Sequence, residues 1–443
     1  MRITVISALT AVALMIGTAH AQTALERENA ELKERIDRLE SDVSQLKSQL
    51  EKPRAPEEKP ALRSKFGAEL YGFIKGDAAY MTARANDAGN YARWIESEEL
   101  NKDDDQFNLT ARESRFGFML QGPTIDSMQT GGRIEMDFYE GGAENKNRPM
   151  MRHAYLQLDW PKSGWSVLAG QTSDVVSPLW PDTLNYSVGW WVGNIGYRRP
   201  QFRGTKTFTW AKDIQFQAQV AIARTIGHFG PFNPEDSAYD TGKDAGFPTV
   251  QARYAVSFPL FNGKKSSFGV SGHWGEEEYD KDATGDDTHM ETWSACADIL
   301  IVITDWLTLK GEYWTGRDLD SYLGGVGQGV VIETTDGEFL NGGKVTGTFI
   351  RDWSVASMGG WGNVVLGPWN GFRSSLGYSV DHPDSDDVLT RGRTRNYTCW
   401  GMLAYDINPA VRVGVELSWW GTKYRDLEDG DALRAQTSMI FRF

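Results

Sequence analysis

Arginine recurs at alternate positions in several segments of this chain, and the spacing predicts a row of guanidinium groups facing water. In 131–140 (GGRIEMDFYE), Arg133 lies opposite an apolar face made by Ile134, Met136 and Phe138. Successive side chains of a strand point to opposite faces, so such a segment has one apolar and one polar face. The same alternation gives further arginines a polar-face position: Arg115, Arg199, Arg203, Arg253, Arg373, Arg412 and Arg434.

Carboxylates on these polar faces are fewer than the arginines. They are Glu135, Asp137, Asp298, Glu312 and Glu416. A guanidinium group stays charged and holds a carboxylate in a bidentate fork. A charge on a lipid-facing side would cost about 2–4 kcal/mol at mid-depth, so these residues are expected to face an aqueous lumen that favours anions. The alternative is that the arginines only pair with the acids and brace the wall.

The arginines belong to sixteen candidate strands that begin at Phe66. They lie near 66–80, 107–120, 129–140, 150–160, 164–172, 199–210, 214–225, 249–259, 266–276, 290–303, 306–317, 347–366, 370–381, 393–406, 411–422 and 432–443. The break inside 347–366 is uncertain, and this run is taken as one strand. An even number of such strands is typical of a bacterial outer-membrane barrel. We therefore predict an all-β fold, a 16-stranded antiparallel transmembrane β-barrel over 66–443.

The connections between these strands alternate between short and long. The predicted turns include Pro161 to Gly164, Thr304-Asp305 and Gly367-Pro368. The predicted loops cover 81–106, 141–149, 173–198, 226–248, 277–289, 318–346, 382–392 and 423–431. Short periplasmic turns and long outer loops are what bacterial barrels show. Strand one then runs outward from the periplasm.

The third outer loop, 173–198, is aromatic and poor in charge. Trp180, Trp190 and Trp191 are poorly suited to open solvent, so we expect this loop to fold into the lumen or a subunit interface. In general porins the third loop narrows the barrel. Asp174 and Asp182 would then form an acidic edge of the constriction, opposite the arginines.

The chain ends on a strand-like segment, 433–443 (LRAQTSMIFRF). Leu433, Ala435, Thr437, Met439, Phe441 and Phe443 share one face of this segment. A terminal strand that is apolar on one side and ends on an aromatic residue is typical of the closing strand of an outer-membrane barrel. We expect it to pair with the first strand, near 66–80.

The N-terminal part of the chain precedes the barrel and has a different character. Residues 1–21 combine Arg2, an apolar stretch and Ala19-His20-Ala21, which predicts a signal peptide. Over 22–51, Leu25, Leu32, Leu39 and Leu46 fall at d, and Asn29, Ile36, Val43 and Leu50 fall at a. This heptad pattern predicts a short α-helical coiled coil. Residues 52–65 are a proline-rich linker.

Composition agrees with an exported barrel. Aromatic residues make up 12% of the chain, which suits the interfacial girdles of a barrel. The net charge of -14 gathers in the outer loops. These acids include Glu96, Asp104, Glu277, Glu278, Asp384 and Asp426. They are either plain solvated loop residues or groups that meet the divalent cations of lipopolysaccharide, and no nucleic-acid partner is expected.

The two cysteines, Cys296 and Cys399, each lie in a strand-like segment, and free thiols are favoured over a disulfide. No metal-ligand spacing is present, and neither a metal nor a cofactor is expected. The histidines form no motif with a nucleophile, so we do not expect an enzyme.

Several short motifs in order, KFGAELYGFIKGDAAY, ESRFGF, RHAYLQL, AGQTSD and RRPQFR, resemble the DcaP-like porins. The likeness covers nearly the whole mature chain. It implies a homotrimer in the outer membrane of a Gram-negative bacterium, with the coiled coil in the periplasm. It also implies diffusion of small anionic solutes, dicarboxylates in particular, through a constriction bearing Arg115, Arg199 and Arg203. The long aromatic third loop departs from the family pattern.

Two other functions remain open from the sequence. Phosphate-selective porins share the plan of a coiled coil followed by a barrel. The barrel could also serve as an anchor for a coiled coil that tethers the outer membrane. Inward-facing charges on many strands favour a water-filled channel over an inert anchor.

Overall fold

The computed structural model describes residues 30–43, 67–86, 91–101, 104–139, 147–227, 240–281, 284, 286–341 and 344–443. The chain divides into two compact units, Met1–Ser64 and Lys65–Phe443. In the first unit, residues 30–43 are helical, and Leu32, Ile36, Leu39 and Val43 on the heptad seam are all exposed. The signal peptide, the linker and the rest of the predicted coiled coil lie outside the described residues, so these assignments stay predictions.

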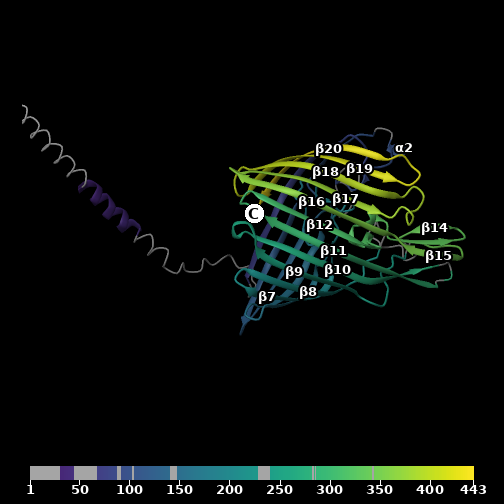
Figure 1. Cartoon of the computed structure of the whole chain (residues 1–443), viewed down its shortest axis with the longest axis horizontal. Coiled ribbons are helices and arrows are strands. Elements are labelled where there is room, and N and C mark those ends of the chain that lie inside the picture. The colour runs from purple at the N-terminus through teal and green to yellow at the C-terminus, as the bar shows by residue number, and fades with distance from the viewer. Residues whose placement is uncertain are drawn as a thin grey trace, which may run out of the picture. The chain divides into compact units, whose positions relative to one another are not determined.

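The second unit is a closed antiparallel barrel (Figure 1). β1 (Gly67–Met81) pairs with β20 (Gly430–Arg442), which closes the wall as the sequence predicts. β2 (Gln106–Thr110) and β3 (Arg115–Ile125) pair with successive parts of β1, so they form one interrupted strand. Counted this way, the described part of the chain forms sixteen wall strands.

The other wall strands follow one another around the barrel, each paired with the next. They are β4 (Met128–Asp137), β5 (Met150–Trp160), β6 (Trp165–Ser173), β7 (Arg198–Ala211), β8 (Ile214–Ala223), β9 (Thr249–Pro259), β10 (Lys265–Asp280), β11 (Asp287–Val302), β12 (Leu307–Arg317), β16 (Ala356–Trp369), β17 (Phe372–Pro383), β18 (Arg393–Asp406) and β19 (Val411–Tyr424). No helix among the described residues is long and apolar enough to cross a bilayer.

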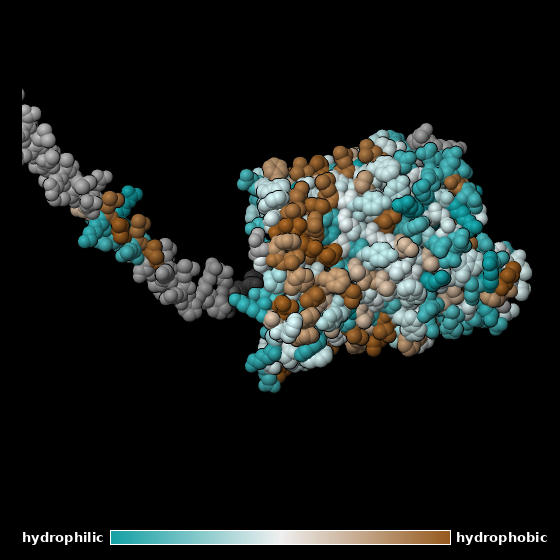
Figure 2. All heavy atoms as spheres, in the orientation of Figure 1, coloured by the Kyte–Doolittle hydropathy of each residue, from teal (hydrophilic) through white to brown (hydrophobic). Residues whose placement is uncertain are grey.

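Period-two alternation decides which side chains face outward. On β4, Ile134 is 42% exposed on the outside, whereas the next residue, Glu135, is 1% exposed and points inward. Phe202 on β7 and Met439 on β20 are also exposed on the outside. Figure 2 shows a band of hydrophobic side chains on the wall nearer to the turn end, while the loop end is mostly hydrophilic. Such an apolar belt around a closed sheet suits a lipid environment.

Short turns gather at one end of the barrel and long loops at the other. The turn between β3 and β4 spans only 126–127, and the turn between β7 and β8 spans 212–213. In contrast, the connections at the other end include 82–105, which contains α2 (Glu98–Asn101), and 174–197. The turn after β9 holds a short 3-10 helix, η2 (Phe261–Gly263). The predicted sorting of the connections is therefore present.

The connection between β12 and β16 differs from the prediction. The run 347–366 does not form one wall strand, because β15 (Phe349–Ser354) pairs with β13 (Val330–Thr334) in a separate three-stranded sheet with β14 (Gly337–Leu340). The apolar residues Val330, Val331 and Ile332 of β13 are fully buried. Their burial stabilises the three-stranded sheet, so β15 pairs with β13 and not with a wall strand. The connection also contains η3 (Asp320–Tyr322) and η4 (Gly325–Gly327).

Candidate functional site

The third outer loop, 174–197, lies inside the barrel. The Leu179 amide donates to Glu312 Oε1 on β12 at 2.7 Å, and Trp400 Nε1 on β18 donates to the Asp182 carbonyl at 3.0 Å. Gln436 Nε2 on β20 donates to the Leu184 carbonyl at 2.9 Å. The loop therefore reaches wall strands far from β6 and β7, which carry its two ends.

An aromatic cluster holds this loop in place. Trp190 and Trp191 are 1% and 2% exposed. They pack with Tyr186 of the same loop, with Tyr91 of the first loop and with Tyr139, which follows β4. The ring centroids of Trp180 and Trp190 lie 5.5 Å apart, in an edge-to-face arrangement that aromatic pairs favour. The cluster fills the space between the loop and the wall.

The two acids of this loop lie apart from each other and do not form the acidic edge expected from the sequence. Asp174 is buried, with its Oδ1 2.9 Å from Arg199 Nε and 2.7 Å from Gln251 Nε2. Asp182 forms an ion pair with Lys310. A buried charge such as Asp174 requires such partners, whereas the Asp182 side chain is 38% exposed. Both carboxylates anchor the loop to the wall.

Arg199 is not a pore-lining residue, which corrects the prediction. Its side chain is 1% exposed and lies 3.9 Å from the centre of the Tyr322 ring. One guanidinium nitrogen donates to the Ser321 carbonyl at 3.2 Å. The alternation along β7 correctly turns Arg199 inward, but segments from two loops fill the lumen at this depth and cover it.

On the described wall strands, inward-facing arginines remain partly exposed in three groups, and the first lies on β3, β4 and β5. Glu135 and Asp137 each accept a hydrogen bond from Arg152 at 2.7 Å. Arg133 also pairs with Glu135, and Arg115 lies 3.7 Å from the same carboxylate. We call these residues, Arg115, Arg133, Glu135, Asp137 and Arg152, the arginine–carboxylate cluster. It contains three guanidinium groups and two carboxylates.

Arg152 is absent from the sequence prediction because the alternation breaks at this residue. Glu135 of β4 pairs with His153, and the next residue, Met136, pairs with Met151. A β-bulge therefore leaves the backbone of Arg152 without an opposing residue in the register of β4. The bulge turns the Arg152 side chain inward, beside that of His153. A strict period of two cannot place two consecutive residues on one face, and nothing else in the sequence marks this bulge.

The second exposed group lies on β7, β9 and β11, beside the third loop. Arg253 on β9 donates to Asp298 on β11 at 2.7 Å. Arg203 on β7 donates to Gln201 Oε1 and to the Ser173 carbonyl, and among the described residues it forms no ion pair. Both arginines line a cavity of about 260 Å³ that also contacts Trp180 of the third loop.

The third group lies at the turn end of β17, β18, β19 and β20. Asp406 accepts from Arg412 at 2.6 Å and from Arg373 at 3.3 Å, and Arg442 lies 4.0 Å away. The side chains of Arg373 and Arg442 are 40% and 37% exposed. Three guanidinium groups surround one carboxylate, so this group carries excess positive charge.

Other predicted inward charges lie outside these exposed groups. Arg434, Glu416 and Glu312 face inward, but all three are at least 95% buried. Arg203, Arg253, Arg115, Arg133 and Arg373 are the predicted arginines of the candidate site that keep some access to the lumen.

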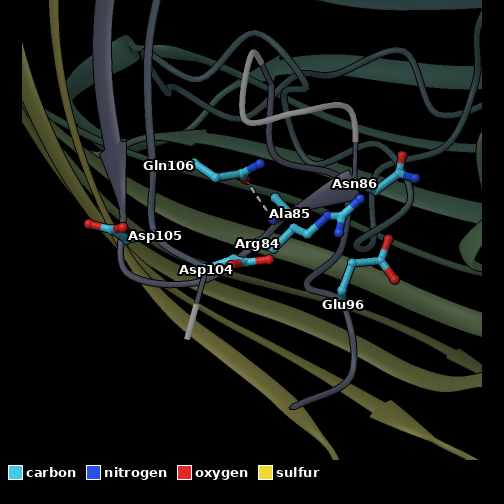
Figure 3. A pocket seen from close by; sticks show the side chains of 7 residues that line it. All are labelled: Arg84, Ala85, Asn86, Glu96, Asp104, Asp105 and Gln106. Atoms are coloured by element: carbon cyan, nitrogen blue, oxygen red, sulfur yellow. Dashed lines mark hydrogen bonds between the residues drawn. The ribbon is translucent and has the colours of Figure 1, made fainter. Parts of the chain in front are cut away.

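A hollow of about 440 Å³ lies in the first loop and is lined by seven residues between 84 and 106 (Figure 3). Glu96, Asp104 and Asp105 contribute three carboxylates to this hollow, against one cation from Arg84. A hollow with this charge repels anions, so it is not part of the arginine-lined site.

Two of the described histidines, His153 and His273, lie beside hydroxyl groups, contacts that no sequence motif indicates, and only His273 contacts a serine. His273 Nδ1 is 2.7 Å from Ser294 Oγ, and its Nε2 is 3.0 Å from Thr292 Oγ1. A catalytic histidine needs an orienting group and access to substrate. Here the second nitrogen contacts a threonine, and the Tyr322 ring stacks on the imidazole with the ring centroids 3.9 Å apart. The pair therefore packs the loop against the wall.

The two cysteines are free, as expected. Cys399 is exposed on β18, and Cys296 is buried on β11. Cys296 packs beside Trp314 and Val176, where the third loop meets the wall.

Comparisons with known proteins bear on the fold. No protein-family model and no curated protein matches this chain. Among solved structures, the outer membrane channel DcaP of Acinetobacter baumannii is similar with a TM-score of 0.64 and 19% identity, over 86% of this chain and 99% of that chain. The two proteins share a fold. The resemblance to DcaP-like porins that the motifs indicate is confirmed at that level.

A second solved structure also shares the fold, with a lower TM-score and a lower sequence identity. The anion-selective porin from Comamonas acidovorans is similar with a TM-score of 0.51 and 9% identity, over 86% of this chain and 100% of that chain. The barrel of this chain thus follows the architecture of known outer-membrane channels.

Proposed function

We propose that this chain is an outer-membrane porin for the passive diffusion of small hydrophilic anions such as dicarboxylates. The observation that carries the proposal is the charge of the three partly exposed groups, each of which contains more guanidinium groups than carboxylates. A lumen with fixed positive charge concentrates anions and repels cations. The fold shared with two channels supports a transport function over a purely structural one.

Arg203 and Arg253 are the residues that we propose contact the permeating anion. They line one cavity beside the third loop, and among the residues described Arg203 forms no ion pair, because Asp174 at the edge of the same cavity is paired with Arg199. A guanidinium group binds a carboxylate or phosphate oxygen pair in a fork. Arg115, Arg133 and Arg373 would act more weakly, because neighbouring carboxylates share their charge. Conduction needs such weak, successive sites.

The third loop is the proposed constriction. Asp174 and Asp182 tie it to the wall, while Trp180, Trp190 and Trp191 fill the lumen around it. Because the loop bonds to many strands, its position is fixed by the barrel itself. This role does not require Asp174 or Asp182 to contact the solute.

We also propose that the chain forms a homotrimer, with the turn end of the barrel and the coiled coil in the periplasm. In 30–43, the seam residues Leu32, Ile36, Leu39 and Val43 are 50–56% exposed in a single chain. Burying such a seam between helices stabilises a coiled coil. The acidic outer loops would then face lipopolysaccharide and its divalent cations.

The test is the reversal potential of the purified protein in a planar bilayer under a gradient of potassium chloride. We expect the reversal potential to lie closer to the equilibrium potential of chloride than to that of potassium. Replacing both proposed contacts, R203A/R253A, should lower the anion-to-cation permeability ratio roughly fivefold, which corresponds to about 1 kcal/mol. The matched control R203K/R253K keeps both charges and should keep most of the preference. Cation preference or the absence of conductance in the unmodified protein would contradict the proposal.

The same bilayer distinguishes the class of anion. Phosphate and a dicarboxylate such as succinate can be added to one side at equal charge, and the current carried by each compared. A larger dicarboxylate current supports the proposal in its specific form. A larger phosphate current would instead favour the phosphate-selective alternative.

A further inference from the structure

Three carboxylates converge at the loop end of the barrel, away from the arginine-lined site. Glu277 lies near the end of β10, and Asp318 and Asp320 follow β12 directly. All three are buried, with exposures of 0%, 0% and 1%. One oxygen from each lies within 4.8 Å of the others. We call these residues the carboxylate triad.

Two members of the triad lack the partners that a buried charge requires. Both carboxylate oxygens of Asp318 and Oε1 of Glu277 are buried without a hydrogen-bond partner. Among the described residues, no lysine, arginine or histidine forms an ion pair with either side chain. The nearby guanidinium of Arg199 is bound to Asp174 and stacked on Tyr322. An uncompensated carboxylate in a buried site is costly, so the triad is incomplete as it stands.

The remaining oxygens of the triad hold it in a defined arrangement. Tyr279 donates its hydroxyl to Glu277 Oε2, and the Ser321 amide donates to Asp320 Oδ1 at 2.8 Å. The unpartnered oxygens therefore point to a missing positive charge.

A glycine keeps the space beside these oxygens open. A Cβ atom at Gly329 would overlap both Asp318 Oδ1 and Asp320 Oδ1. Gly329 is not in the left-handed region of backbone conformation, so the backbone itself does not require glycine here. The absence of a side chain preserves room around the two aspartates.

We propose that Glu277, Asp318 and Asp320 bind one divalent cation, Ca²⁺, between the barrel wall and the segment 318–329. Carboxylate oxygens are the ligands that hard divalent cations prefer. Three side chains brought together from a strand and a loop form an irregular site, which Ca²⁺ accepts more readily than Mg²⁺, because Mg²⁺ requires nearly ideal octahedral geometry.

The cation would fix the segment that covers Arg199. Tyr322 of η3 stacks on Arg199 and accepts from Gln251 at 2.9 Å, and Leu323 packs in the aromatic cluster of the third loop. The Trp191 amide also donates to the Leu323 carbonyl at 2.7 Å. Binding at the triad thus stabilises the contact between the two loops that fill the outer lumen. This inference does not depend on the proposed transport function.

The experiment is calcium binding to the purified full-length protein after dialysis against chelator. Isothermal titration should show about one saturable site per chain, with Kd below about 10⁻³ M, the weaker end of known calcium sites. Tb³⁺ should bind the same site with luminescence sensitised by Tyr279, and Ca²⁺ should displace it. Mg²⁺ added alone should compete at least tenfold less effectively.

The test variant is E277Q/D318N, which removes two charges without changing side-chain size. The matched control, D384N/D386N, removes two charges from the exposed loop after β17. We expect the triad variant to lose the saturable site and the control to retain it. Chelator should lower Tm of the unmodified protein and of the control by several degrees, and should leave Tm of the triad variant unchanged.

Two outcomes would overturn the proposal. One is the absence of a saturable site in the unmodified protein, a result that does not depend on the folding of any variant. The other is a triad variant whose Tm in calcium equals or exceeds that of the unmodified protein in calcium, because this would show that calcium does not stabilise the protein through the triad.

Discussion

The barrel contains two buried groups of acidic residues with opposite surroundings. In the arginine–carboxylate cluster, Glu135 and Asp137 lie beside three guanidinium groups, and Arg152 contacts both carboxylates at 2.7 Å. In the carboxylate triad, Glu277 and Asp318 form no ion pair within the described part of the chain, and oxygens of both lack hydrogen bonds. The carboxylates of both groups are almost fully removed from solvent.

This difference follows from where the residues come from. The first cluster is built by adjacent wall strands, so neighbouring positions of β3, β4 and β5 supply both signs of charge. The triad combines the end of β10 with the connection after β12, and the neighbouring Arg199 is already paired with Asp174. The first cluster is therefore complete within the protein, while the second requires a cation or protons from outside.

The largest effect is expected when the first cluster loses its central cation. Arg152→Ala removes the partner of both Glu135 and Asp137 and leaves two buried carboxylates poorly compensated. We expect the free energy of unfolding to fall by about 3–5 kcal/mol. Urea unfolding of the barrel in lipid vesicles, followed by tryptophan fluorescence, measures this change. A loss below about 1 kcal/mol would show that Arg115 and Arg133 are enough to compensate the charges of the two carboxylates.

A smaller effect, with opposite signs in the two groups, is expected from neutralising one aspartate. Asp137 accepts from Arg152 at 2.7 Å and from the Tyr186 hydroxyl at 2.6 Å, so Asp137→Asn should cost about 1–3 kcal/mol. Asp318→Asn, measured in chelator, removes repulsion and should leave the unfolding free energy unchanged or raised. Equal destabilisation by both substitutions would remove the distinction between the two groups.

The smallest effect is expected at the solvated group around Asp406. Arg373 is 40% exposed, so Arg373→Ala should change the unfolding free energy by less than about 1 kcal/mol. The change should disappear in 1 M salt, where the screening length is about 3 Å. The effect of Arg152→Ala should persist in the same salt, because a buried pair is screened much less. Similar salt dependence for both variants would indicate that water reaches Arg152.

The sequence predicts most of the wall. Alternation along β4 and β7 correctly assigns Ile134 and Phe202 to the outside, and Arg133 and Arg203 to the inside. The prediction works because the two faces of a strand meet different solvents, so local polarity records the direction of each side chain. The sorting of short turns and long loops is equally local.

Prediction fails where distant segments meet. Arg199 points inward as expected, but Tyr322 from a loop more than a hundred residues away covers it. Glu277 is assigned to a solvated loop from its acidic neighbours, whereas β10 continues to Asp280 and buries it. Arg152 is missed because a bulge, which no local pattern marks, shifts the alternation by one residue.

By itself, the sequence determined most of the wall strands, though not the run 347–366, the lipid-facing side of strands such as β4 and β7, and the end of the barrel where the loops gather. These properties depend on period-two polarity and turn lengths, which are local. Only the tertiary structure decided which arginines remain accessible, how the third loop crosses the lumen and that Glu277 meets Asp318 and Asp320. These properties depend on the closure of the barrel, because the curved wall brings side chains into contact that lie far apart along the chain.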